Sequence, residues 1–459
     1  MILATNGAPD TDAALAGDTL PGAALARAWR LTEAEQTDRA VLELAAVDSA
    51  LADAMRGWLL VDREPSAAIS VLRAAMARGL RSVDVLVNLG YALHGVGAVR
   101  KAALVTREAT AIAPTDVTAA YNLTVYLRQL GRHADALAEL SRVADLRPND
   151  LELALRHAWA HINLAEDPRA ALRHLKKSHA RLAWSAPGDK RAEFEASIAF
   201  LEHRLGRRAL APTRQYLWKR VALVPHSGEV ASMLAGLYGE PEDVPELRRL
   251  ILEAGSALGP ARVLVQRARV AVLESDLPQA IGLVLEAVEA APTDPYAAGF
   301  AAYIVGEAGG DYGRACEIAL RAYRANPEPS LANNLAFSLA LAHRGTEAAR
   351  LIRDAGGPSK LPYGGATAAL VELAQGRVAS AAQGYAEAVA HVAAQGDQEM
   401  AEIIDWRQRL AMVQFGVPLA SGVTLAEPGG SKHASARNVL REVARRLAGT
   451  YAAGPLAMT

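Results

Sequence analysis

Apolar residues recur along most of this chain at steps of three and four positions, which is the spacing of one face of an α-helix. In residues 83–116 this pattern places Leu89 and Leu93 on one face, breaks at Gly97 and resumes up to Pro114. Helices commonly end at a glycine, and a proline cannot continue one. The pattern therefore predicts two short antiparallel helices in this segment, joined by a turn.

The pattern of residues 83–116 recurs 34 positions later, in residues 117–150. The identical residues are Asn88 and Asn122, Leu89 and Leu123, Leu93 and Leu127, Gly97 and Gly131, Ala102 and Ala136, Pro114 and Pro148, and Asp116 and Asp150. These identities in one register indicate an internal repeat, and such repeats build stacked arrays. Similar units begin at 151, 261 and 362, and looser units begin near 49, 190, 228, 295 and 329. We expect about ten units over residues 49–395.

The repeated positions resemble those of the tetratricopeptide repeat (TPR) family. The family motif has small residues at positions 8, 20 and 27, a glycine or another turn residue at position 15 and a proline at position 32. The unit that begins at Val83 supplies, in chain order, Gly90, Gly97, Ala102, Ala109 and Pro114. The resemblance implies an all-α fold, a right-handed superhelical solenoid of TPR-like helix-turn-helix repeats with a concave groove.

The two ends of the chain differ from the repeats. An array needs capping helices, because its terminal units would otherwise expose their apolar faces. Segments of small and polar residues cannot bury enough apolar surface to fold. We expect a disordered N-terminus (1–20), N-terminal capping helices (21–48), a C-terminal capping helix (396–416), a linker (417–435) and a basic amphipathic tail helix (436–459).

The net charge is −1, from 49 basic and 50 acidic residues, but the charges are segregated along the chain. Residues 151–226 carry +7, residues 227–431 carry −9 and residues 432–459 carry +4. The basic segment 151–226 fits a solvated helix face, a contact with an acidic protein or a nucleic-acid surface. We favour the solvated face, and we do not expect nucleic acid as a partner because few aromatic residues are interleaved with the basic ones.

The tail helix places Arg437, Arg441 and Arg445 along one edge and apolar residues along another. Because the units before it are acidic, we expect this helix to dock on the C-terminal units of its own chain or of a neighbouring molecule. Docking on a neighbour would give self-association. The alternatives are a frayed terminal helix and a helix that lies on a membrane surface.

The sequence lacks the motifs of common enzyme classes. It has no GxxxxGKS or GxxxxGKT loop, no GxGxxG after a strand, and no HExxH, GxSxG or CxxC. Its single cysteine, Cys316, excludes an internal disulfide. We therefore expect no enzymatic activity and no cofactor. An apolar run long enough to span a membrane and a secretory signal are also missing, so we expect a cytoplasmic protein. We also expect a bacterial one.

Histidines cluster in the second quarter of the chain, where His157 and His161 are one helical turn apart and could share a metal ion. They occupy repeat positions 7 and 11, however, which usually pack in the core. No cysteine or suitably spaced carboxylate completes a ligand set. We therefore expect these histidines to be packing or surface residues and expect no metal site.

The groove of the array is the expected partner site. Position 6 of the first helix commonly faces this groove in TPR proteins, and an asparagine there offers a donor and an acceptor that match a peptide backbone. Aromatic residues and arginine are the usual anchors of protein interfaces. The partner-binding residues predicted in this way are Asn88, Tyr91, Tyr121, Asn122, Arg128, Arg156, Trp159, Asn334 and Phe337. The alternative is that the asparagines cap or solvate an exposed face.

These observations favour a non-enzymatic interaction scaffold or adaptor that binds a peptide or helix of a protein partner. The carboxylate clamp by which some TPR proteins bind chaperone tails is not expected, because only Asn122 and Arg156 match its pattern. The alternative function is a regulatory sensor that binds a peptide or ligand and controls a separate effector protein. A repeat scaffold supports many functions, so the partner's identity does not follow from the fold.

Overall fold

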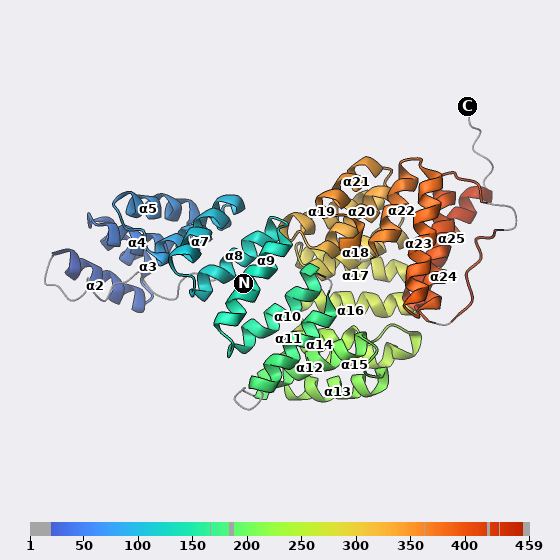
Figure 1. Cartoon of the computed structure of the whole chain (residues 1–459), viewed down its shortest axis with the longest axis horizontal. Helices are drawn as coiled ribbons and strands as arrows, with labels where there is room; N and C mark the ends of the chain where they lie inside the picture. Colours follow the sequence, from blue (N-terminus) through green and yellow to red (C-terminus); the bar gives the residue numbers. More distant parts are fainter. Residues whose placement is uncertain are drawn as a thin grey trace. The chain divides into compact units, whose positions relative to one another are not determined.

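The computed structural model describes residues 20–165, 167–182, 188–361, 363–419, 423–430 and 432–452. Within these ranges the regular structure is entirely helical, so the predicted all-α class is confirmed (Figure 1). Of the segment expected to be disordered, residues 1–19 lie outside the described residues, as do residues 453–459 of the tail. The chain divides into two compact units, Met1–Leu153 and Ala154–Thr459, which we describe separately.

The described part of the N-terminal unit, from residue 20, contains two helices followed by three helical hairpins of the predicted repeat length. The first two are α2 (Leu20–Glu33) and α3 (Thr37–Ala45). The hairpins are α4 (Ala50–Leu60) with α5 (Pro65–Ala77), α6 (Val83–Gly95) with α7 (Val99–Ile112), and α8 (Val117–Gln129) with α9 (His133–Leu146).

The C-terminal unit begins within α10 and continues the series of hairpins. They are α10 (Leu151–Ala165) with α11 (Pro168–Leu182), α12 (Gly188–Arg204) with α13 (Leu210–Leu223), α14 (Gly228–Ala235) with α15 (Val244–Leu258), α16 (Pro260–Leu273) with α17 (Leu277–Ala290), α18 (Pro295–Tyr303) with α19 (Tyr312–Ala325), α20 (Pro329–Leu341) with α21 (Gly345–Asp354), and α22 (Gly364–Ala374) with α23 (Val378–Ala394). Counted over the described residues of both units, the array has ten hairpins.

Short helical segments interrupt this regular series at three points. They are the 3-10 turns η1 (Pro241–Asp243) and η3 (Pro358–Lys360) and the π-helical segment η2 (Ile304–Ala308), which extends α18. The stretch around 190–260, whose repeats were weak in the sequence, contains two complete hairpins. Its second hairpin has a first helix of only eight residues, α14, followed by η1.

The repeat is encoded at the helix ends as well as in the apolar pattern. The carboxylate of Asp116 accepts a hydrogen bond from the Ala119 N–H at 2.6 Å, and Asp294 caps α18 in the same way. Such N-caps satisfy backbone donors that the helix itself leaves open. Between the two helices, Gly97 and Gly131 have φ of +75° and +69°, the left-handed region that favours glycine. The repeated aspartates and glycines therefore mark where helices begin and turn.

The last two helices of the described residues pack against each other, α24 (Gln398–Gln414) and α25 (Ala434–Ala452). Their contact is an apolar cluster formed by Ile403, Trp406, Leu410, Leu440 and Val443. Helix α25 also packs on α16 and on η2. The buried Asn438 side chain donates to the Val272 carbonyl at the end of α16, at 2.8 Å. The tail helix thus docks on its own chain, whereas self-association through it stays a prediction.

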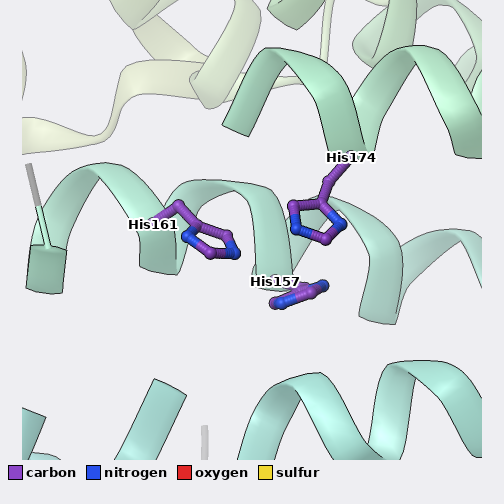
Figure 2. Close-up of side chains that lie close together, drawn as sticks. All are labelled: His157, His161 and His174. Atoms are coloured by element: carbon purple, nitrogen blue, oxygen red, sulfur yellow. The ribbon is translucent and has the colours of Figure 1, made fainter. Parts of the chain in front are cut away.

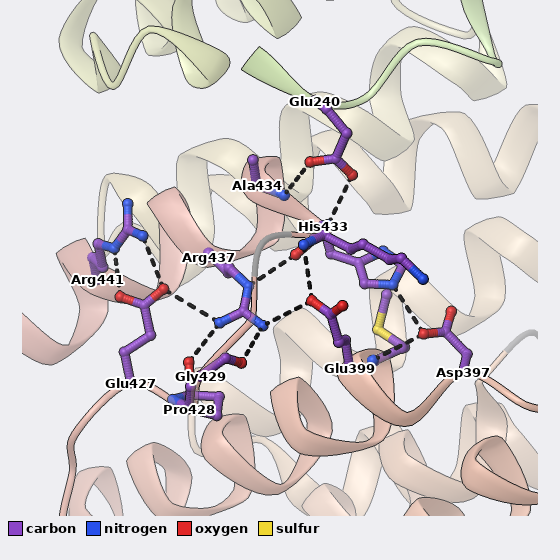
Figure 3. Close-up of polar contacts among 12 residues, drawn as sticks. Glu240, Asp397, Glu399, Glu427, Pro428, Gly429, His433, Ala434, Arg437 and Arg441 are labelled. Atoms are coloured by element: carbon purple, nitrogen blue, oxygen red, sulfur yellow. Dashed lines mark hydrogen bonds and ion pairs between the residues drawn. The ribbon is translucent and has the colours of Figure 1, made fainter. Parts of the chain in front are cut away.

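Polar contacts hold the segment before α25 and the start of that helix in place (Figure 3). The buried Arg437 guanidinium donates to the backbone oxygens of Pro428 and Gly429, at 2.7 and 2.9 Å, and lies beside Glu427. The Glu240 carboxylate accepts the backbone N–H of His433 at 2.9 Å, at the N-terminal end of α25 where a negative charge is favoured. Both these polar contacts and the buried apolar cluster therefore hold α25 on the C-terminal unit.

Burial alone would raise the pKa of the Glu427 carboxyl, but the Arg441 and Arg437 side chains hold this pKa below its usual range. Arg441 donates from Nε and Nη2 to the two Glu427 oxygens at 2.6 and 2.9 Å, and Arg437 Nη1 donates to Oε1 at 3.4 Å. The carboxylate of Glu427 is consequently stabilised in its charged form by the docked tail.

Candidate partner-binding pocket

A cavity of about 360 Å³ lies within the C-terminal unit, and we call it the C-terminal pocket. Residues of α18, η2, α20, α22, α23, α24 and α25 line it, together with Tyr363 just before α22. Most of its surface is apolar, supplied by residues such as Phe337, Met400, Ile403, Ile404 and Leu440. Because α25 contributes Leu440 and Ala436, the docked tail helix forms part of the pocket wall. Concave apolar sites of this size are typical of ligand-binding sites.

One side of the pocket contains a buried ion pair between Glu307 and Arg407. The Arg407 Nε donates to Glu307 Oε2 at 2.6 Å and Nη2 donates to Oε1 at 3.0 Å. The Glu307 side chain is 1% exposed and also accepts a hydrogen bond from the hydroxyl of Tyr312 at 3.0 Å. A buried carboxylate is costly unless it is paired and hydrogen-bonded, and these three bonds meet that need.

The backbone that carries Glu307 is unusual. Glu307 belongs to the π-helical segment η2, and π-helical turns inside helices are frequent at functional sites. The Arg446 side chain from α25 donates to the carbonyl oxygens of Glu307 and Ala308, at 2.5 and 2.6 Å. The tail helix therefore supports the backbone that positions the buried carboxylate.

Two polar atoms of the pocket lining are buried without a hydrogen-bond partner. They are Nη1 of Arg407, a donor, and Oδ1 of Asn333, an acceptor. Each unsatisfied polar atom costs about 1–3 kcal/mol of stability. A ligand that reached these two atoms with an acceptor and a donor, after a small movement of the side chains, would recover this free energy.

Tyr303, Tyr363 and Tyr385 line the same cavity, and Tyr312 contacts the Glu307 carboxylate beside it. Burial raises the pKa of Tyr303 and of Tyr385, so both hydroxyl groups stay protonated near neutral pH. Burial and the Glu307 carboxylate raise the pKa of Tyr312 to about 12. Tyr363 differs from these, because its side chain is 65% exposed and its φ is +52°, an uncommon conformation for a bulky residue. Such backbone conformations concentrate at binding sites.

The structure brings only two of the nine predicted partner-binding residues into this pocket. Asn334 and Phe337 line it, and the Phe337 ring lies 5.5 Å from the Arg407 guanidinium carbon. Arg156 and Trp159 lie on α10, and the Trp159 ring packs 6.3 Å from that of Phe200. These two residues are half-buried and do not line the pocket.

The other five predicted residues belong to the N-terminal unit. Asn88 and Asn122 are both 0% exposed, so the expectation that position 6 faces an open groove is wrong for them. The reason is that the first helix of each hairpin packs against its neighbours in the array, as α8 does against α6. Tyr91 is half-buried and donates to Asp62 at 2.7 Å. The last two, Tyr121 and Arg128, are half-buried. A role of these residues in partner binding stays a prediction.

Sequence reasoning missed Glu307, Arg407 and Asn333. Glu307 and Arg407 are 100 positions apart, so no local spacing connects them. The only available signal was a single charge inside otherwise apolar helical stretches, as at Glu307 within the segment 303–308. Asn333 precedes the predicted Asn334 and was missed because only repeat position 6 was expected to face the groove.

In sequence pattern and in helical architecture the array is TPR-like. Among solved structures, the chain is similar to a tetratricopeptide repeat protein from Parabacteroides merdae, with 14% identity and a TM-score of 0.46 over 56% of this chain and 100% of that chain. It is similar to yeast Tom70, with 13% identity and a TM-score of 0.37 over 85% of this chain and 96% of that chain. It is also similar to YrrB, described as a TPR protein with an unusual peptide-binding site, with 19% identity and a TM-score of 0.31 over 38% of this chain and 93% of that chain. No protein-family model matches the chain, and no curated protein sequence matches it. Among the described residues no helix combines the length and apolarity that crossing a membrane requires.

Proposed function

We propose that this chain is a non-enzymatic, cytoplasmic interaction scaffold of a bacterium that binds a peptide segment of a protein partner in the C-terminal pocket. The observation that carries the proposal is the pair of unpartnered buried atoms, Arg407 Nη1 and Asn333 Oδ1, in a largely apolar cavity. A peptide backbone offers a carbonyl oxygen for the arginine and an N–H for the asparagine. An apolar side chain next to that amide would fill the cavity.

The electrostatics of the pocket favour a neutral ligand. Arg407 is already paired with Glu307, so the two side chains together contribute no net charge. An isolated phosphate or carboxylate would have to compete with the Glu307 carboxylate for the guanidinium group, whereas a backbone carbonyl uses only the remaining Nη1 donor. The cavity, at the small end of the range for ligand sites, suits one or two side chains of a short segment.

The test fills the cavity without touching its polar groups. Ala366 on α22 is half-buried and lines the pocket, and Ala366→Trp would occupy the space of the incoming side chain. Short peptides tiled from the host proteome and selected on the wild-type chain are measured by fluorescence polarisation. We expect at least a tenfold loss of affinity in Ala366→Trp, because overpacking excludes the ligand side chain.

The matched control is Ala382→Trp, which places the same side chain at an exposed position of α23. It should leave the affinity within about twofold of wild type, since surface substitutions have small effects. Circular dichroism checks that both variants fold. Selected peptides that bind Ala366→Trp as tightly as wild type would overturn the proposed site.

A second variant tests the polar recognition. Asn333→Leu removes the unpartnered amide while keeping a similar volume, so it should stabilise the free chain and weaken the selected peptides by about 2- to 10-fold, the loss of one net hydrogen bond. Stabilisation without weakened binding would show that Asn333 does not contact the peptide.

A further inference from the structure

Three histidine side chains meet inside the hairpin of α10 and α11, in the C-terminal unit (Figure 2). His157 and His161 lie one turn apart on α10, and His174 reaches them from α11. The ring centroids are 4.4 Å apart for His157 and His174, 4.7 Å for His161 and His174, and 4.9 Å for His157 and His161. One ring nitrogen from each lies within 4.8 Å of the others.

The same three repeat positions are occupied by aliphatic side chains in other hairpins. The first helix supplies positions 7 and 11 and the second supplies position 24. In α8 and α9 these positions hold Leu123, Leu127 and Leu140, and in α20 and α21 they hold Leu335, Leu339 and Ile352, all of them buried. Three histidines have therefore replaced three core residues at once.

Core packing does not explain this replacement. His157 is only 5% exposed, and Nε2 of His161 is buried without a hydrogen-bond partner. A buried ring nitrogen without a hydrogen-bond partner, as in His161, costs free energy that a leucine at the same position would not. Three imidazoles that face one another can instead hold a metal ion, because the unprotonated nitrogen of each neutral ring offers one lone pair.

We propose that His157, His161 and His174 bind a divalent late first-row transition-metal ion, with Zn²⁺ as the reference ion. An all-nitrogen imidazole set suits zinc, copper and nickel ions, whereas magnesium and calcium prefer oxygen ligands. With Zn–N bonds of about 2.0–2.1 Å, ligand nitrogens in tetrahedral coordination lie about 3.4 Å apart. Small side-chain rotations would bring the three nitrogens from their present separation to that distance.

Three protein ligands leave one coordination position open, for water or for a donor atom of a partner. His161 and His174 are half-buried, whereas His157 is buried. The ligands come from both helices of one hairpin, and a bound ion would therefore clamp α10 to α11. None of the three histidines lines the C-terminal pocket, so this proposal is independent of the proposed peptide site.

The experiment titrates the full-length chain, stripped of metal with a chelator, with Zn²⁺ in competition with a chromophoric zinc indicator. We expect one equivalent to bind and the thermal midpoint to rise with Zn²⁺ concentration, as mass action requires. Metal affinity should fall by at least about 10-fold in each single variant, His157→Leu, His161→Leu or His174→Leu. The reason is that losing a residue that only supports a ligand already weakens metal binding by about 10-fold or more, and these substitutions remove a ligand itself. Tetrahedral Co²⁺ absorption in the visible range provides a second readout of the ligand geometry.

Leucine is chosen because equivalent hairpins already carry it, so the variants should fold. The triple leucine variant should melt at or above the temperature of the metal-free wild type and should lose the Zn²⁺-dependent rise. The control is His391→Ala, which removes an exposed histidine of α23 and should keep full affinity. Binding of less than one equivalent, unchanged affinity in the triple variant, or an equal loss in His391→Ala would each overturn the proposal.

Discussion

Replacing Arg407 by methionine should destabilise the C-terminal unit locally and strongly. The methionine keeps much of the long aliphatic stem but removes both hydrogen bonds to Glu307 and the contact with the Phe337 ring. Each charge-assisted bond is worth about 1.5–3 kcal/mol, and stranding one member of a buried pair costs about 3–5 kcal/mol. The Tyr312 hydroxyl would remain as a donor to the carboxylate, and one neutral donor does not replace a cation.

A second substitution separates the stranded charge from the lost packing. Adding Glu307→Gln to Arg407→Met removes the negative charge and keeps an acceptor for Tyr312. Because replacing both members of a buried ion pair is often close to neutral, the double variant should recover most of the loss and end within about 1–2 kcal/mol of wild type. The comparison is a double-mutant cycle for the pair.

Hydrogen exchange measured by mass spectrometry on peptides from η2 and α24 reports this local free energy. A loss of 3–5 kcal/mol corresponds to exchange that is roughly 100-fold to a few thousand-fold faster, at a factor of ten for each 1.4 kcal/mol. The control is Arg409→Met on the same helix, which breaks a more exposed pair with Asp405 and a hydrogen bond to the Thr424 carbonyl oxygen and should cost less, about 1–2 kcal/mol. The reasoning is refuted if Arg407→Met exchanges no faster than Arg409→Met, or if the double variant recovers nothing.

Further expectations concern the tail and the packing. Removing residues 430–459 should speed hydrogen exchange in α24 and η2, since both lose their contacts with α25, and unchanged protection would contradict the docking. The lowered pKa of Glu427 adds stability that is present above its unfolded value near 4.3 and is lost as the pH falls through the lowered folded value. The melting temperature should therefore fall more steeply below pH 4 in wild type than in Glu427→Gln. Gly364→Ala would push a Cβ into the Pro358 carbonyl oxygen and should lower the free energy of unfolding by about 1–3 kcal/mol. Gly282→Ala lies inside α17 with open space around it and should raise the free energy of unfolding by about 0.5–1 kcal/mol in the same melting experiment.

The local part of the architecture was determined by the sequence alone. The 34-residue period, the caps at Asp116 and Asp294 and the turns at Gly97 and Gly131 act within one hairpin, over a few residues each. Hydrophobic period, capping and turn chemistry are short-range properties, so they can be seen without any tertiary contact. The docking of the basic tail on its own chain was also predictable, because its charge and amphipathic pattern stand out from the acidic units before it.

The tertiary structure alone decided which of these faces are covered and which distant side chains meet. Asn88 is buried because the neighbouring hairpins pack over it, which a single repeat does not reveal. Glu307 and Arg407 form one ion pair across 100 residues, and His174 joins His157 only once α11 folds back along α10. The physical reason is that burial and side-chain proximity depend on how hairpins stack, and stacking is fixed by long-range packing rather than by the period of the repeat.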